Sequence, residues 1–146
     1  MIDRKHIGRV SGAHTVEVEK GRLRFFARSI GETNPIYYDE GAARAAGYRS
    51  LPAPPTFVFC LDLEKDNPFK DLDEMGINLG KMLHAEQSFT YHAPICAGDA
   101  ITIENRVSDI YDKKGGALEF VVKDYTARNQ EGTLVAEMRC VLVVRN

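Results

Sequence analysis

The sequence has few of the features that mark membrane-spanning, secreted or metal-binding proteins. No run approaches the roughly 18 consecutive apolar residues that a transmembrane helix needs, and the first ten residues contain no apolar signal-peptide core. Only three cysteines occur, Cys60, Cys96 and Cys140, and they are widely spaced in apolar surroundings. An odd number at such spacing predicts neither a disulfide framework nor a zinc site. We therefore expect a cytoplasmic protein whose cysteines are small buried hydrophobic residues.

The charge balance likewise lacks an excess of either sign. The chain has 146 residues, with 19 basic and 21 acidic side chains and a formal net charge of −2. The two signs are interspersed, so there is no electrostatic footprint for nucleic acid or for an anionic membrane. We expect neither partner. A chain of this length is large enough to bury a core, and we assign residues 1–146 to one domain.

The first half of the chain has the periodicity of helices. Between residues 19 and 30, apolar side chains recur at helical spacing on one face and Gly31 follows as a stop: Leu23, Phe26, Ala27 and Ile30. A second helix is predicted for residues 39–47, with the Asp39 side chain as its N-cap.

A proline-rich bend leads from these helices into a short apolar segment. Pro52, Pro54 and Pro55 exclude regular structure across the bend, and residues 56–61 then predict a helix that is apolar on nearly every side. Such a helix belongs in the core. The following residues 66–74 contain asparagine, proline and aspartates and are predicted to form a surface loop.

From residue 83 onward the hydrophobic period changes towards two, which is typical of strands. Residues 83–92 divide into a mixed apolar face and a polar face, and His84 and His92 both fall on the polar one. Since these histidines are eight residues apart on one strand, we do not expect them to share a metal, and for each a structural or surface role is the simpler interpretation.

Three further strands are predicted to form an antiparallel meander. Residues 101–107 begin it, a glycine-rich turn at 113–116 leads to residues 117–126, and a turn at 129–132 leads to the alternating segment 134–144. The apolar face of this meander needs a partner, and the helix at 56–61 is the obvious one. The pattern predicts an α+β domain in which a curved antiparallel sheet wraps around a central apolar helix, although it also permits other α+β folds.

Four segments carry a resemblance to a known family. They are Gly-Glu-Thr-Asn-Pro-Ile-Tyr (residues 31–37), Ala-Pro-Pro-Thr-Phe (53–57), His-Ala-Glu-Gln (84–87) and the run from Pro94 to Asp99. In this order and spacing they resemble the MaoC-like dehydratases, and in particular the N-terminal type of FAS1-like dehydratase domain. The resemblance covers nearly the whole chain and implies a single hot-dog domain related to the (R)-specific enoyl-CoA hydratases.

The resemblance also implies a chemistry, and it shows where this chain departs from it. Catalytically competent members carry Gly-Asp-x-Asn-Pro-x-His, in which the carboxylate and imidazole hold a water, take its proton and return a proton to the α-carbon of an enoyl thioester. Backbone N–H groups near the central helix meet the charge on the thioester oxygen. Here the aspartate position is Glu32 and the histidine position is Tyr37. Glutamate extends the carboxylate by one methylene, and a tyrosine that titrates near 10 is a poor base at neutral pH.

These substitutions predict a catalytically impaired chain that binds substrate for a partner. The resemblance implies units of two hot-dogs, fused or heterodimeric, in which one half supplies the acid and base and the other helps to bind the acyl chain. No cofactor or metal is expected, and coenzyme A or acyl carrier protein would carry the thioester. The candidate substrate-binding residues on the matching segments are Asn34, Pro54, Pro55, Thr56, Phe57 and Phe59.

Other interpretations remain open at this stage. The chain is alternatively a homodimeric hydratase that acts through Glu32 with His84 as a second catalytic group, or a non-catalytic module that binds acyl thioesters. Glu32 is equally well explained as a turn residue, and Asn34-Pro35 is first a turn device. In either case the sheet of a single hot-dog leaves an edge strand unpaired, which predicts at least a dimer, homomeric or heteromeric.

Overall fold

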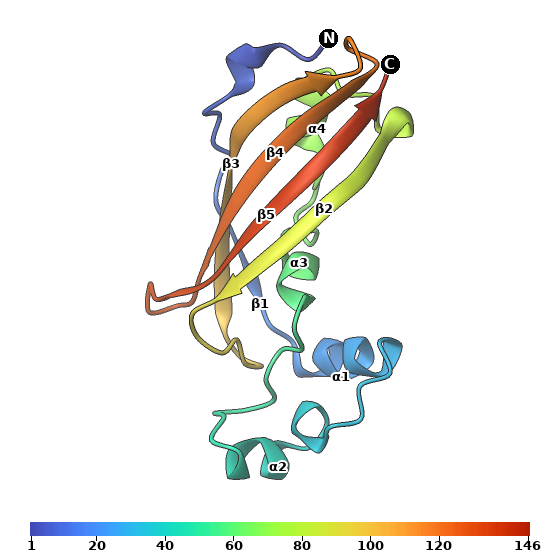
Figure 1. The fold of residues 1–146 in the computed structure, drawn as a ribbon. Helices are drawn as coiled ribbons and strands as arrows, with labels where there is room; N and C mark the ends of the chain where they lie inside the picture. The colour runs from blue at the N-terminus through green and yellow to red at the C-terminus, as the bar shows by residue number, and fades with distance from the viewer.

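A five-stranded antiparallel sheet wraps around one central helix in the computed structural model, which describes residues 1–146 (Figure 1). The strands are β1 (His14–Glu17), β2 (Met82–Tyr91), β3 (Ala100–Lys113), β4 (Leu118–Arg128) and β5 (Leu134–Arg145), in the spatial order β1-β3-β4-β5-β2. The α-helices are α1 (Lys20–Ser29), α2 (Glu40–Ala45), α3 (Phe57–Asp62) and α4 (Lys70–Glu74), and short 3₁₀ turns cover Arg4–His6, Pro35–Tyr37 and Leu79–Lys81.

The helices are unevenly distributed over the sheet. Helices α1 and α2 lie together beyond one end of the strands, whereas both chain termini lie at the opposite end (Figure 1). Helix α3 runs along the inner face of the sheet, and its Phe57, Val58 and Leu61 side chains are at most 2% exposed. Phe57 also meets Phe26 of α1 edge to face, with ring centroids 5.2 Å apart. The prediction that residues 56–61 form a core helix is therefore confirmed.

The two helices before the proline bend are confirmed with one correction. Helix α1 ends before Gly31, whose φ of +71° suits glycine at that position, and the Asp39 carboxylate caps α2 by accepting a hydrogen bond from the Ala42 N–H at 2.7 Å. Ile30 was assigned to the buried face of α1, but its side chain is 52% exposed. The helix has already ended there, so helical spacing no longer determines where that side chain points.

Two elements were missed by the sequence analysis. The segment 66–74, predicted as a surface loop, contains α4, and the apolar side chains of Leu72 and Met75 are buried against the core. Strand β1 is only four residues long and pairs with β3 from His14 opposite Ile103 to Glu17 opposite Ala100. Both elements are too short to show a period of their own, so only their contacts with the rest of the domain establish them.

The meander β3-β4-β5 is confirmed, and β2 completes the sheet by pairing with β5. A register shift between His84 and Glu86 changes which residues of β2 face inward. His84 lies opposite Leu142 and Gln87 opposite Cys140, and both partners are buried on the inner face. The prediction that His84 and His92 share a face is wrong, because the bulge breaks the alternation on which it rested. No helix in the structure is both long and apolar enough to cross a bilayer.

Candidate functional site

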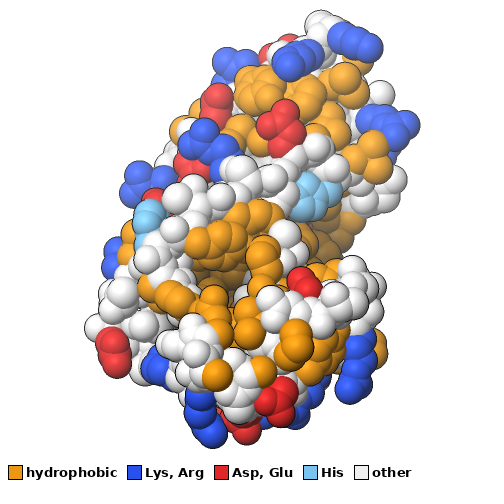
Figure 2. Space-filling view, turned by 60° about the horizontal axis from the view of Figure 1, so that its bottom comes forward, with side chains coloured by type: hydrophobic (Ala, Val, Ile, Leu, Met, Phe, Trp, Pro, Cys, Tyr) orange, Lys and Arg blue, Asp and Glu red, His pale blue; other side chains and the backbone are white.

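A cavity of about 360 Å³ lies where the β2–β3 connection meets the proline-rich bend. Most of its lining is apolar, with phenol groups among it: Tyr37, Tyr48, Pro52, Ala53, Pro54, Pro55, Val58, Tyr91, His92, Ala93, Pro94 and Ile95. Seen from the helical end, the surface has a hollow surrounded by hydrophobic side chains (Figure 2). Its volume is at the small end of the range for ligand pockets, and its mixture of apolar walls with a few polar groups is typical of them.

Backbone and side-chain bonds tie the walls of this cavity together. The Ala53 N–H donates to the Ile95 carbonyl at 2.7 Å, which joins the proline bend to the β2–β3 connection. Behind them lies Asp99, whose carboxylate forms an ion pair with the Arg49 guanidinium at 2.8 Å and accepts one hydrogen bond from it at 2.9 Å. The carboxylate also accepts hydrogen bonds from the Cys96 N–H at 2.9 Å and from the Gln130 amide at 3.3 Å. The Asp99 side chain is 1% exposed. The buried Asp99 carboxylate thus links the segment before the proline bend to the β2–β3 connection, and both segments line the cavity.

Tyr37, at the position of the family histidine, lines the cavity. It ends a 3₁₀ turn that begins at Pro35, and the Asn34 side chain caps this turn by accepting a hydrogen bond from the Ile36 N–H at 3.2 Å. Burial, followed by the nearby charges of Glu32 and Tyr48, raises the pKa of the Tyr37 hydroxyl above its ordinary value of 10. At neutral pH the phenol therefore keeps its proton, and it can donate a hydrogen bond to a ligand but cannot act as a base.

Glu32, at the position of the family aspartate, is turned back into its own loop. Its Oε1 accepts hydrogen bonds from the Thr33 and Asn34 N–H groups, both at 2.8 Å, and its carbonyl accepts one from the Tyr38 hydroxyl. The carboxylate is not among the groups that line the cavity. In this conformation the Glu32 carboxylate stabilises the turn after α1.

Two backbone donors at the start of α3 are already engaged. The Thr56 N–H donates to the Tyr91 hydroxyl at 2.8 Å, and the Phe57 N–H donates to the Pro54 carbonyl at 3.1 Å. Thr56 holds this position with a φ of +77°, an uncommon conformation for a residue with a branched side chain. Neither of these two N–H groups is free to meet a thioester oxygen in the structure as it stands.

The structure separates His84 of β2 from His92, which follows the strand. His84 is remote from the cavity lining: its Nε2 lies 3.0 Å from Gln87 Oε1 and 3.5 Å from Cys140 Sγ, and its ring lies beside Phe59. His92 does line the cavity, and its Nε2 lies 2.8 Å from Glu137 Oε2. The sequence analysis preferred His84 because it falls in a family segment. The signal that pointed to His92 was its place between Tyr91 and Pro94, at the end of the strand.

Of the residues proposed from sequence, the structure brings three together at the cavity: Tyr37, Pro54 and Pro55. Thr56 adjoins it through Tyr91, and Phe57 lies in the core behind it. Glu32, Asn34, Phe59 and His84 are outside its lining. Sequence reasoning missed most of the walls, including Tyr48, Tyr91 and Ile95, because they come from segments that only the fold brings side by side. No group of three or more His, Cys, Asp or Glu side chains is arranged to hold a metal ion.

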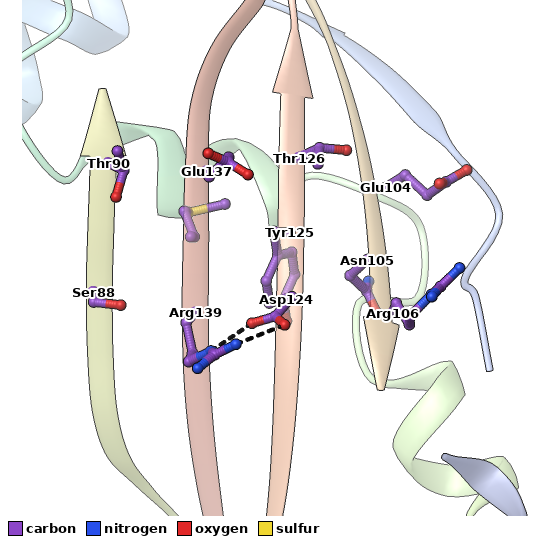
Figure 3. Close-up of a pocket in the computed structure, with 11 residues that line it drawn as sticks. Ser88, Thr90, Glu104, Asn105, Arg106, Asp124, Tyr125, Thr126, Glu137 and Arg139 are labelled. Carbon is purple, nitrogen blue, oxygen red and sulfur yellow. Dashed lines mark hydrogen bonds and ion pairs between the residues drawn. The ribbon is translucent and has the colours of Figure 1, made fainter. Parts of the chain in front are cut away.

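A larger concavity of about 550 Å³ lies on the outer face of the sheet (Figure 3). Its lining is mostly polar, and at its centre the Arg139 guanidinium donates two hydrogen bonds to the Asp124 carboxylate at 2.6 and 2.9 Å. An acyl chain gains nothing from such a surface, since the burial of apolar area would be offset by the loss of water from the charged groups. The apolar cavity at Tyr37 is therefore the candidate site.

The sequence between residues 5 and 138 matches the family described as the FAS1-like, dehydratase domain region. The chain belongs to this family. Relatives with the same domain extent include a UPF0336 protein of Parafrankia sp., which is 36% identical over 88% of this chain and 84% of its own length. Another, from Saccharopolyspora erythraea, is 31% identical over 99% of this chain and 92% of its own length.

Solved structures of similar proteins confirm the hot-dog fold for this FAS1-like dehydratase domain. A chain of the Mycobacterium tuberculosis HadBC complex, a (3R)-hydroxyacyl-ACP dehydratase, is 28% identical with a TM-score of 0.78, covering 94% of this chain and 96% of that one. The R-hydratase PhaJ1 of Pseudomonas aeruginosa, at 17% identity and a TM-score of 0.71, covers 96% and 82%. This last likeness concerns the fold alone.

Proposed function

We propose that this chain is the acyl-thioester-binding, catalytically impaired subunit of a two-hot-dog enzyme. With a catalytic partner it would serve the (R)-specific hydration of 2-enoyl thioesters or the reverse dehydration of 3-hydroxyacyl thioesters. The membership of the family and the fold support the reaction class. The observation that carries the division of labour is Tyr37: a protonated phenol lines the apolar cavity at the place where competent relatives carry a histidine.

The chemistry of hydration explains why this cavity would bind an acyl thioester without catalysing its hydration. A base must take a proton from water while a proton is delivered to the α-carbon. The only family carboxylate position, Glu32, is engaged with two backbone N–H groups of its own loop, and the Tyr37 hydroxyl has a raised pKa. Apolar walls and hydrogen-bond donors remain, which suit the binding of an acyl group but leave proton transfer to another subunit.

The unpaired edge of the sheet is an argument for a partner hot-dog subunit. Strand β2 is ten residues long and pairs only with β5, so its other side is an unpaired edge. Large apolar side chains on it remain open to solvent, with Leu83 46% and Tyr91 45% exposed. A long, partly apolar edge invites pairing with another strand. The HadBC and ChsH1–ChsH2 structures of Mycobacterium tuberculosis are complexes, and the second, at 22% identity, is a neighbour in fold alone.

One observation favours a second candidate function, a hydratase that acts without a different partner. His92 lines the cavity, and its Nε2 lies 2.8 Å from the Glu137 carboxylate in a pair whose side chains are 40% and 49% exposed. If His92 supplied the proton transfer, Glu32 would not be needed, and it could remain part of the turn after α1. The two candidates therefore differ in which side chains the activity requires.

We expect the purified chain alone to hydrate crotonyl-CoA no faster than buffer, because its cavity lacks an acid–base pair. The loss of the enoyl-thioester absorbance would measure this, with an active (R)-hydratase as the positive control. Adding a hot-dog protein with an intact Gly-Asp-x-Asn-Pro-x-His is expected to give turnover of hexenoyl-CoA that exceeds that of the partner alone by tenfold or more.

Variants distinguish the outcomes of this experiment. Turnover by the chain alone that disappears in His92→Gln would replace the helper-subunit proposal by the second candidate. Turnover that disappears in Glu32→Gln would show that the Glu32 carboxylate leaves its loop to act as a base. Glu131→Gln, at an exposed carboxylate outside the cavity lining, serves as the matched control for Glu32→Gln.

The mass of the protein in solution tests the predicted dimer. Because β2 leaves an unpaired edge, we expect a particle of about twice 16.3 kDa at micromolar concentration, as a homodimer or with a partner hot-dog. Sedimentation equilibrium would measure the mass of the chain alone and of its mixture with the partner. A single 16.3 kDa species in both samples would contradict the prediction.

A further inference from the structure

We propose that the outer face of the sheet, at the end that carries the chain termini, binds an acidic amphipathic helix of a partner protein. This face lies away from the cavity and serves no step of the proposed function. Leu83 and Tyr91, near opposite ends of β2, are about 26 Å apart at 3.3 Å per residue, and only Tyr91 lines the cavity. Three features carry the inference: an apolar patch, a row of cations along one flank of it, and carboxylates along the other.

Apolar side chains gather on the outer face of the sheet at this end. The strand register places them in two neighbouring rows, which we call the outer patch: Tyr111, Phe120, Val143 and Leu83 in one row, and Val122 and Val141 in the next. The Tyr111 and Phe120 rings stack with centroids 4.8 Å apart, and Leu83 is 46% exposed. Figure 2 shows hydrophobic side chains at the upper end of the molecule, away from the hollow, with lysine and arginine side chains around them. An apolar patch with a polar border is typical of a binding surface.

Cations follow one flank of the outer patch, at the end of the strands. Lys113 of β3 and Arg145 of β5 lie in one row across the sheet, and Lys81, just before β2, lines a surface concavity together with Arg145 and Leu83. None of these three cations forms a salt bridge. The Lys113 Nζ lies over the Phe120 ring instead, 5.1 Å from its centroid. Acidic side chains along this flank would meet uncompensated positive charge.

Carboxylates border the opposite flank of the outer patch. Asp109 of β3 and Glu86 of β2 are both exposed, and they end the row that contains Val122 and Val141. A row of four side chains spans about 14 Å across the strands, the length of about ten helical residues. A helix that lies along the rows therefore has cations on one side and carboxylates on the other. If its own acidic residues follow one side of an apolar stripe, it fits in one direction only.

The same charges argue against a second copy of the chain as the occupant. In a face-to-face pair whose two-fold axis runs along the strands, the cation row would face its own copy. With the axis across the strands through the outer patch, the cation row would face the row of Arg106, Asp124 and Arg139, in which Asp124 is already paired with Arg139. Both arrangements bring like charges together.

A flat anionic membrane also fits this surface poorly. Asp109 and Glu86 lie in the outer row beside the valines of the patch, so a bilayer that covered the patch would press both carboxylates against its headgroups. A helix is narrow enough to lie over the apolar rows and the cation row without covering these acids. The charge pattern therefore favours an acidic protein segment.

Fluorescence anisotropy with a labelled synthetic helix of about 14 residues tests the proposal on the full chain. The probe carries leucines in one stripe, glutamates along one side of the stripe and glutamines along the other, and a covalent staple on its solvent side keeps it helical. In a second probe lysines replace the glutamates. We expect the glutamate probe to bind about tenfold more tightly than the lysine probe, and its binding to weaken with added salt. Equal binding of the two probes, or none of either, would overturn the proposal.

Variants locate the binding surface. Arg145→Gln and Lys81→Gln each remove one exposed cation and should weaken binding of the glutamate probe about threefold. Arg106→Gln is the matched control, because Arg106 is an exposed arginine on the same face that forms no salt bridge but lies beyond the patch, and it should change the affinity less than about twofold. Phe120→Thr should weaken binding about tenfold. If Phe120→Thr fails to fold, Val143→Thr replaces it, and unchanged affinity in the folded Arg145 and Val143 variants contradicts the proposal.

Further measurements assign the surface if the occupant differs. On adding the glutamate probe, amide NMR signals of Phe120 and Arg145 should shift while that of Tyr37 stays unchanged, and shifts confined to the cavity would overturn the proposal. Flotation of the chain with phosphatidylserine vesicles, without binding of the probe, would make the patch a membrane surface instead. A wild-type dimer that Phe120→Thr converts to a monomer would assign the patch to a second copy.

Discussion

Asp99→Asn is expected to lower the free energy of unfolding by about 3 kcal/mol. The Asp99 carboxylate is 1% exposed, is ion-paired and hydrogen-bonded with Arg49, and accepts hydrogen bonds from the Cys96 N–H and the Gln130 amide. An amide removes the charge, and its NH₂ group faces donors that it cannot satisfy. The cost is placed at the low end of the range for a broken buried pair, because Arg49 is 58% exposed and can be hydrated. Urea unfolding followed by circular dichroism would measure it.

The sheet offers a matched control for this substitution. Asp124 accepts two hydrogen bonds from one arginine, Arg139, but their side chains are 40% and 59% exposed. Exposed pairs contribute little, so Asp124→Asn should cost less than about 1 kcal/mol. Equal losses in Asp99→Asn and Asp124→Asn would show that burial does not determine the strength of the Asp99 pair.

The Asp99 pair also matters for binding, because of what it holds. Arg49 belongs to the segment that continues into the proline bend, and Cys96 follows Ile95 of the cavity wall. Losing the carboxylate should loosen both walls at once. We therefore expect hexanoyl-CoA binding to weaken in Asp99→Asn but not in Asp124→Asn, measured under conditions in which both variants remain folded.

Phe57→Ala is expected to lower the free energy of unfolding by about 4 kcal/mol, enough to leave a marginal domain largely unfolded. The Phe57 ring is 2% exposed at the start of α3 and packs edge to face against Phe26. Its removal leaves a cavity between the central helix and α1, where Phe26 loses its aromatic partner. Thermal unfolding followed by calorimetry would show the loss.

Phe25, the residue before Phe26 in α1, provides the control. Its side chain is 72% exposed, so Phe25→Ala should change the free energy of unfolding by no more than about 0.5 kcal/mol. A Phe57→Ala protein that is as stable as Phe25→Ala would mean that α3 is not the centre of the core. The cavity would then also lose its support, since Val58 lines it from the same helix.

The helices that could be predicted from sequence are those with local signals. Apolar periodicity predicted α1, the Asp39 cap predicted α2, and a run apolar on every side predicted the buried position of α3. The glycine turns likewise predicted the meander β3-β4-β5. Helix α4 and β1 were missed because five- and four-residue elements have too little sequence to show a period. Their stability comes from packing and pairing, which are not local.

His84 in β2 and His92 just after it show more clearly what a sequence pattern cannot predict. A single extra residue at the bulge between His84 and Glu86 turns His84 inward, beside Cys140, and the alternation of the sequence gives no sign of it. His92 instead reaches the cavity from the end of the strand. Which histidine adjoins the candidate site was therefore decided by strand register.

The sequence by itself determined the family of this protein, the order of its main elements and the two departures, Glu32 and Tyr37, from the residues that the reaction needs. Each of these can be recognised from residues that lie close together in the sequence. Only the tertiary structure decided what those departures mean, because the Glu32 carboxylate bonds to its own loop while Tyr37 faces a cavity. The walls of that cavity come from segments some 40 residues apart, which hydrogen bonds between distant backbone groups and one buried carboxylate bring together.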